Sequence, residues 1–219
     1  MISAKKIVDE LKKHNTNEID VVVLPEVALS EDAYDARIPL DAALKILPFS
    51  LKHCAPLIND LAEERDGNWF VSNSWICHSL SNYFKLDLMI GLSDYDYKKK
   101  HSYNAFFLFK PGVLNAQKHI KRVLIPLTEY LPFQWLTKFM KTFGIEEFYQ
   151  KGEKNSVLGA SFANIAPVIC IEEGYSDLIK KSVQNGADLI VSINNDVWFP
   201  FTTLSYEHLY LGALRALEN

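Results

Sequence analysis

Residues 165–175, Ile-Ala-Pro-Val-Ile-Cys-Ile-Glu-Glu-Gly-Tyr, decide how the rest of the sequence is interpreted. The apolar run over 165–169 predicts a short buried strand that ends in a turn. A helical pattern follows over about 175–184, which places Cys170 at an exposed strand-to-helix turn. The start of a helix directs free N–H groups and a positive dipole end toward such a thiol and favours the thiolate. Cys170 is therefore a candidate nucleophile, although a lone cysteine more often fills a gap in the core.

The composition excludes several classes of protein. A chain of 219 residues, 48% of them hydrophobic, is long enough for one large domain or two small ones. Its net charge of -4, with no basic stripe interleaved with aromatic residues, argues against nucleic acid as a partner. The three cysteines include no Cys-x-x-Cys pair, which argues against a disulfide framework or a zinc site. No stretch approaches the roughly 18 apolar residues of a membrane span, and the N-terminus does not resemble a signal peptide, so the sequence predicts a soluble chain.

Alternating strand and helix patterns predict an α/β layered fold. In the segment 20–25, every residue after Asp20 is apolar, as is typical of a strand buried on both faces of a sheet covered by helices. The predicted strands are 20–25, 69–76, 86–92, 103–109 and 187–193, and the predicted helices are the N-terminal segment up to about His14, then 51–64 and 204–217.

Two charged residues could serve a nucleophilic cysteine. Glu26 lies just past the strand at 20–25, where burial would raise its pKa and suit it to act as a general base, although by this position alone an acid that begins the next helix is the more common case. Lys121 precedes apolar residues that lead it toward the interior, and an ammonium beside a thiolate lowers the cysteine pKa and stabilises an oxyanion. None of the six histidines stands in a local motif, so a Cys/His pair through space stays open as an alternative.

The segment 133–148 combines helical spacing of aromatic residues with interspersed lysines. Its pattern fits a core helix, and it also fits an amphipathic arm that touches lipid. The candidate lipid contacts are Trp135, Phe139 and Phe143.

Four blocks of sequence occur in an order that matches a known superfamily. They are Leu24-Pro25-Glu26, Lys121 followed by 124–132 (Leu-Ile-Pro-Leu-Thr-Glu-Tyr-Leu-Pro), 168–172 (Val-Ile-Cys-Ile-Glu) and 195–199 (Asn-Asp-Val-Trp-Phe). By these blocks the chain resembles the nitrilase (carbon-nitrogen hydrolase) superfamily, and within it the nitrilase-like domain of the apolipoprotein N-acyltransferases. The resemblance implies a four-layer α-β-β-α nitrilase-type sandwich over residues 1–219. It also implies that this sandwich is incomplete at both ends, without the first strand, the closing strands and the membrane region of the family.

The same resemblance implies a Glu-Lys-Cys triad. Glu26 would be the general base, Lys121 the oxyanion-binding cation and Cys170 the nucleophile, with no cofactor and no metal. The residues expected to support them are Glu129, Ile171 and Glu172. The chain departs from the family pattern at three positions, where Thr128, Ile171 and Pro200 replace Gly, Tyr and Gly.

The implied activity is transfer of a fatty acyl chain from a phospholipid, through a cysteine thioester, to the N-terminal amine of a diacylglyceryl apolipoprotein. The implied place is the bacterial inner membrane, with this domain at the membrane surface on the periplasmic face. Two alternatives stay open: a soluble amidase that uses the same triad with water as the acceptor, and an inactive fragment that acts only as a binding module.

Overall fold

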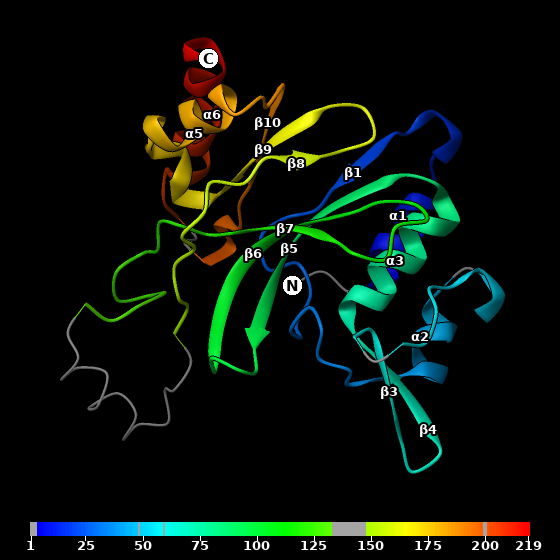
Figure 1. Cartoon of the computed structure of the whole chain (residues 1–219). Helices are drawn as coiled ribbons and strands as arrows, with labels where there is room; N and C mark the ends of the chain where they lie inside the picture. The colour runs from blue at the N-terminus through cyan, green and yellow to red at the C-terminus, as the bar shows by residue number, and fades with distance from the viewer. Residues whose placement is uncertain (1–3, 48, 59, 133–147, 199–200) are drawn as a thin grey trace.

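The computed structural model describes residues 4–47, 49–58, 60–132, 148–198 and 201–219 (Figure 1). The helices are α1 (Ala4–Leu11), α2 (Leu40–Ile46), α3 (Asn73–Phe84), α5 (Ser176–Gln184) and α6 (Leu204–Glu218), with 3-10 helices η1 (Thr16–Glu18), η2 (Leu51–His53), η3 (Cys170–Gly174) and η4 (Asp196–Trp198). The strands are β1 (Val21–Val23), β2 (Ile38–Pro39), β3 (Ala62–Arg65), β4 (Asn68–Val71), β5 (Asp87–Asp96), β6 (His101–Phe109), β7 (Gln117–Ile120), β8 (Leu158–Gly159), β9 (Asn164–Ile169) and β10 (Leu189–Ile193).

The larger sheet has the strand order β1-β5-β6-β7 and two different buried faces. β1 runs parallel to β5, and β5 forms a long antiparallel hairpin with β6 that pairs Leu88 with Phe109. Side chains alternate between the two faces of each strand. One face, which carries Leu88 and Phe107, packs on α1 and α3, and the other carries Met89 and Phe106.

A second sheet, of order β10-β9-β8, lies against the Met89 and Phe106 face of the first. Its parallel β9 and β10 contribute Ile165, Ile169 and Ile193 to the core between the two sheets. α5 contacts the outer side of β9 (Figure 1). The order of layers is therefore helices, sheet, sheet, helix, and the predicted α/β fold is confirmed.

Two of the predicted elements are wrong. Only the first part of the predicted strand 69–76 is a strand, because the side chain of Ser72 accepts a hydrogen bond from the Trp75 amide and begins α3 at Asn73. α3 is buried around most of its circumference, so its sequence lacks the polar face that identifies a helix. The predicted helix 51–64 is instead a 3-10 turn and β3, the strand that pairs with β4 in a hairpin.

The strand predicted at 20–25 is present as β1, but it is not buried on both faces. β1 lies at the edge of the larger sheet as the structure describes it, and the side chain of Val23 is 43% exposed. An unbroken apolar run is therefore compatible with an edge position when one neighbour, here β5, covers it.

Candidate active site

Lys121 is the centre of a buried polar cluster. Its side chain is 1% exposed, and its Nζ donates hydrogen bonds to Glu26 Oε1 at 3.0 Å and to Glu129 Oε1 at 2.9 Å. The Nδ2 of Asn104 donates to the same two oxygens, at 2.6 Å and 3.1 Å. Burial by itself lowers the pKa of Lys121, but Glu26, Cys170 and Glu129 together outweigh it and raise that pKa above its usual value. The lysine is therefore held in its charged form.

Glu26 is placed by the end of β1 and by a glycine on the neighbouring strand. The backbone of Gly91 on β5 accepts from Ala28 and donates to Pro25, which fixes the segment that carries Glu26. A Cβ atom at position 91 would lie 2.6 Å from the Cα of Glu26, a distance that no real Cβ tolerates. The close approach of these two backbones therefore requires glycine at 91.

Lys121 and Glu129 are fixed by the loop that follows β7. The Lys121 amide donates to the carbonyl of Asn104 at 2.8 Å, which continues the pairing of β7 with β6 by one residue. The other carboxylate oxygen of Glu129, Oε2, accepts from the amide of Ile125 at 2.8 Å. Glu129 was expected to be a supporting residue, and its two oxygens connect this loop to the lysine.

Cys170, the first residue after β9, has a left-handed backbone conformation, with φ of +53°. The left-handed region is costly for any residue but glycine, and such residues concentrate at functional sites. Val27, which follows Glu26, has φ of +46°, and Leu127, in the loop that carries Glu129, has φ of +68°. Each of the three segments that supply the candidate triad or its support therefore contains one strained residue.

The sequence predicted an exposed Cys170 at a strand-to-helix turn, with the helix over about 175–184; the helix is present as α5, but the exposure is wrong. Cys170 is only 6% exposed, because it packs in the core between the two sheets. α5 begins six residues later, at Ser176, and the intervening residues form η3. The helical N–H groups nearest the thiol are thus those of a single 3-10 turn.

The three residues expected to form the triad line one cavity of about 220 Å³. It also contacts Asn104, Tyr149 and Asn195. The structure thus brings together residues 26, 121 and 170, which are far apart in the chain, with Glu129 beside them. Asn104 is a site residue that sequence reasoning missed, because an asparagine within the apolar strand predicted at 103–109 has no local signal of its role.

Glu172 fastens the Cys170 turn to the first sheet. Its Oε1 accepts from the amide of Arg122 at 2.6 Å, and its Oε2 accepts from the amide of Ile169 at 2.9 Å. It is 2% exposed, and His119 Nε2 lies 3.3 Å from Oε2. Ile171 is half-buried and lines both of the cavities described next.

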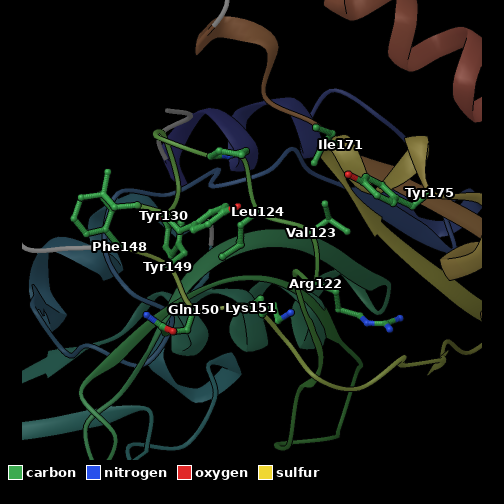
Figure 2. A pocket seen from close by; sticks show the side chains of 12 residues that line it. Arg122, Val123, Leu124, Tyr130, Phe148, Tyr149, Gln150, Lys151, Ile171 and Tyr175 are labelled. Atoms are coloured by element: carbon green, nitrogen blue, oxygen red, sulfur yellow. The ribbon is translucent and has the colours of Figure 1, made fainter. Parts of the chain in front are cut away.

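Two further cavities adjoin the turn. One, of about 350 Å³, contacts Cys170 itself and has a mainly aliphatic wall of Ile125, Ile171, Leu204 and Leu211. The other, of about 630 Å³, is more open, and Figure 2 shows Tyr130, Phe148 and Tyr149 on one side of it and Ile171 and Tyr175 on the other. The candidate lipid contacts Trp135, Phe139 and Phe143 lie outside the described residues.

Neither a metal cluster nor a membrane span is found in the described ranges. No three or more His, Cys, Asp and Glu side chains of the described residues are grouped so that they could hold a metal ion. In the same part of the chain, no helix combines the length and apolar character needed to cross a bilayer.

Comparisons with known proteins identify the family of the chain. The family model for carbon-nitrogen hydrolases matches residues 1–219. The apolipoprotein N-acyltransferase 1 of Treponema pallidum is 32% identical over 143 residues, which are 58% of this chain and 26% of that protein. The apolipoprotein N-acyltransferase of Chlamydia pneumoniae is 26% identical over 211 residues, which are 91% of this chain and 36% of that protein. The chain thus spans between about a quarter and a third of the length of these relatives.

Solved structures share the fold at low sequence identity. Nit3 of Saccharomyces cerevisiae, a member of the nitrilase superfamily, aligns with a TM-score of 0.59 and 22% identity over 97% of this chain and 63% of that one. XC1258 of Xanthomonas campestris, a CN-hydrolase superfamily protein, aligns with a TM-score of 0.58 and 16% identity over 99% of this chain and 66% of that one. The family match over the whole length, together with this common fold, shows that the chain belongs to the carbon-nitrogen hydrolase family.

Proposed function

We propose that this chain is the catalytic domain of an apolipoprotein N-acyltransferase and that Glu26, Lys121 and Cys170 are its triad. The observation that carries the proposal is the buried ammonium of Lys121, bound by Glu26 and Glu129 in the cavity that Cys170 lines. Burying an ammonium costs free energy because the charge loses its hydration. Buried charges of this kind are therefore concentrated at functional sites. We choose acyl transfer as the reaction because the matched relatives are apolipoprotein N-acyltransferases.

The first half of the proposed reaction makes a thioester. Glu26 takes the proton of the Cys170 thiol, and the sulfur attacks the ester carbonyl of a phospholipid acyl chain. An ammonium has three N–H donors, and two of those on Lys121 are taken by Glu26 and Glu129. The third, with the amide of Ile171, stabilises the tetrahedral oxyanion. The ester C–O bond then breaks, Glu26 returns its proton to the lysolipid alkoxide, and the acyl group stays on sulfur.

The second half forms an amide. The N-terminal amine of a diacylglyceryl apolipoprotein attacks the thioester carbonyl, Glu26 accepts a proton from that amine, and Lys121 again stabilises the oxyanion. The C–S bond breaks, the thiolate leaves, and the proton on Glu26 restores the thiol. Every bond broken is matched by one formed, and no cofactor takes part.

The cavity walls support an apolar acyl donor. The aliphatic cavity next to Cys170 has a volume of about 350 Å³ and offers few polar partners to a small hydrophilic amide. An acyl chain, by contrast, gains free energy in proportion to the apolar area it buries, roughly 25 cal/mol per Å². Placement at the periplasmic face of a bacterial inner membrane, where both lipid substrates are found, is part of this proposal.

The test is to identify what becomes attached to Cys170. The protein is incubated with vesicles of phosphatidylethanolamine and phosphatidylglycerol, and each cysteine peptide is weighed by mass spectrometry. We expect a fatty-acyl adduct on Cys170 that disappears when a peptide with an N-terminal diacylglyceryl-cysteine is added, with N-acyl peptide as the product.

Two matched variants control the assay. Cys170→Ser should give no thioester, whereas Cys54→Ser, which changes a half-buried cysteine outside the site, should behave as the unmodified chain. Hydrolysis of a small amide without any acyl adduct would replace the proposal with an amidase. Absence of both activities from a folded protein would leave a binding module.

A further inference from the structure

His208 on α6 is buried beside the candidate nucleophile. Its side chain is 7% exposed, and it lines the aliphatic cavity of about 350 Å³ together with Cys170. Lys121 lines the smaller cavity on which Cys170 also borders. Cys170 thus lines two cavities, with a lysine in the wall of one and a histidine in the wall of the other.

Carboxylates lie at both ring nitrogens of His208. Its Nδ1 is 2.9 Å from Glu173 Oε1, and its Nε2 is 3.5 Å from Asp196 Oδ1. An ionised carboxylate only accepts hydrogen bonds, and a neutral imidazole has one nitrogen that carries a lone pair and no proton. Only the Nδ1 contact with Glu173 is a hydrogen bond, and Nε2 has no hydrogen-bond partner among the described residues. A neutral ring that donates from Nδ1 would turn its Nε2 lone pair toward Asp196, whereas an imidazolium turns an N–H toward it.

Glu173 is placed to hold this ring and not to reach solvent. It is 2% exposed and lies three residues after Cys170 in η3. The side-chain Nδ2 of Asn194 donates to the same Oε1 atom at 2.9 Å. On α6, one turn beyond His208, a Cβ at Gly212 would come within 3.3 Å of Glu173 Oε2, so a residue without a side chain lets the helix approach this carboxylate.

The charged and titratable groups around His208 favour the protonated ring. They are Cys170 and Glu173 on η3, Asp196 on η4 and Glu207 on α6. The contact with Cys170 and the hydrogen bond to Glu173 outweigh burial and raise the pKa of His208 to about 10.

We infer that His208, held as an imidazolium between Glu173 and Asp196, is a positioning residue that stabilises the Cys170 thiolate as a second cation besides Lys121. The inference deepens the proposed function, since it takes Cys170 as the nucleophile. When the thiol ionises, the S–H bond breaks and its proton goes to Glu26, while Lys121 and His208 keep theirs. The histidine changes the charge that faces the sulfur and does not act as its base.

The experiment measures the ionisation of Cys170 without any substrate. The rate of alkylation by iodoacetamide is followed from pH 5 to pH 9, and peptide mass spectrometry separates Cys170 from Cys54 and Cys77. Only the thiolate reacts, so the midpoint of the rate profile reports the cysteine pKa. We expect His208→Gln to raise this midpoint by about one unit, which makes alkylation roughly tenfold slower below both midpoints.

Two variants separate charge from packing. Leu211→Ala removes a neutral side chain from the same cavity and should leave the midpoint unchanged. His208→Lys keeps a positive charge and should restore most of the shift. An unchanged midpoint in His208→Gln, or an equal shift in Leu211→Ala, would overturn the inference.

A second measurement needs no variant at all. The ring nitrogens of His208 in the unmodified protein should show imidazolium chemical shifts by NMR at pH 7, and alkylation of Cys170 should lower the pKa of this ring. A neutral His208 at pH 7 would refute the inference even if the variants fail to fold. Because neither assay contains lipid, a positive result here stands even if acyl transfer is never observed.

Discussion

Replacing the buried lysine tests the electrostatic design of the site most directly. In Lys121→Met, the Oε1 atoms of Glu26 and Glu129 lose the ammonium that both contact at 3.0 Å and 2.9 Å. Asn104 still donates to both oxygens but carries no charge. Removal of one partner from a buried ion pair costs about 3–5 kcal/mol, because the remaining charge is left without compensation. We expect a loss of that size in the free energy of unfolding at pH 8.

The loss should depend on pH in a defined direction. Two neighbouring carboxylates without a cation cannot both stay ionised, so the pKa of one rises above the roughly 4.3 of a glutamate in the unfolded chain. A raised folded-state pKa means that the variant keeps its stability near and below pH 4.3 and loses it as the pH rises through the new value. Each unit of the rise is worth about 1.4 kcal/mol.

Urea denaturation at pH 5.5 and pH 8, followed by circular dichroism, measures this difference. The double variant Lys121→Met/Glu129→Gln removes one of the two charges and should regain part of the loss at pH 8. Lys45→Met is a suitable control, because Lys45 pairs with Asp41 on the exposed surface of α2 and should give no measurable change. Equal losses at both pH values, or a double variant no more stable than the single one, would refute the reasoning.

Two other predictions concern the support of the site and the core. Gly91→Ala should lower stability by about 1–3 kcal/mol and reduce acyl transfer, because the new Cβ would clash with the backbone of Glu26. Calorimetry measures the change in stability, and the thioester assay measures the change in acyl transfer. Gly174→Ala is the control, because a Cβ there meets nothing within 4 Å and should change stability little. His78→Leu should flatten the pH dependence of stability. Burial lowers the pKa of His78 to about 4, so the natural chain loses up to about 3 kcal/mol as the pH falls from 6.5 toward 4, and the leucine variant does not. An unchanged slope in urea titrations across that range would contradict this assignment.

Local pattern was sufficient for the strands and helices whose side chains alternate or repeat in a visible way. The strand at Asn164–Ile169 and the helices α5 and α6 lie close to their predicted bounds. α3 was missed because its serines and Asn73 are buried along with Trp75, so no contrast between faces marks it. The segment at Ala62–Arg65 is a strand only because β4 pairs with it, and that partner is not visible in a window of sequence.

The candidate site was predictable where its residues stand in a recognisable stretch of sequence. Family motifs marked residues 26, 121 and 170, and the structure brings them to one cavity. The role of Glu173 could not be foreseen, because its partners His208 and Asn194 are 35 and 21 residues away in the chain. The burial of Cys170 depends on the packing of two sheets, which no local pattern specifies.

Val27, Leu127 and Cys170 adopt a backbone shape that suits glycine far better than valine, leucine or cysteine. Selection for thermal resistance alone would therefore favour glycine at 27 and 127, since each replacement relieves a penalty of about 1–3 kcal/mol. The same replacement would increase the backbone flexibility of the segments that position Glu26 and Glu129 beside Lys121. Glycine at positions 27 and 127 should therefore raise thermal stability and lower the turnover rate. These two positions are poor targets for engineering a more stable enzyme that keeps its activity.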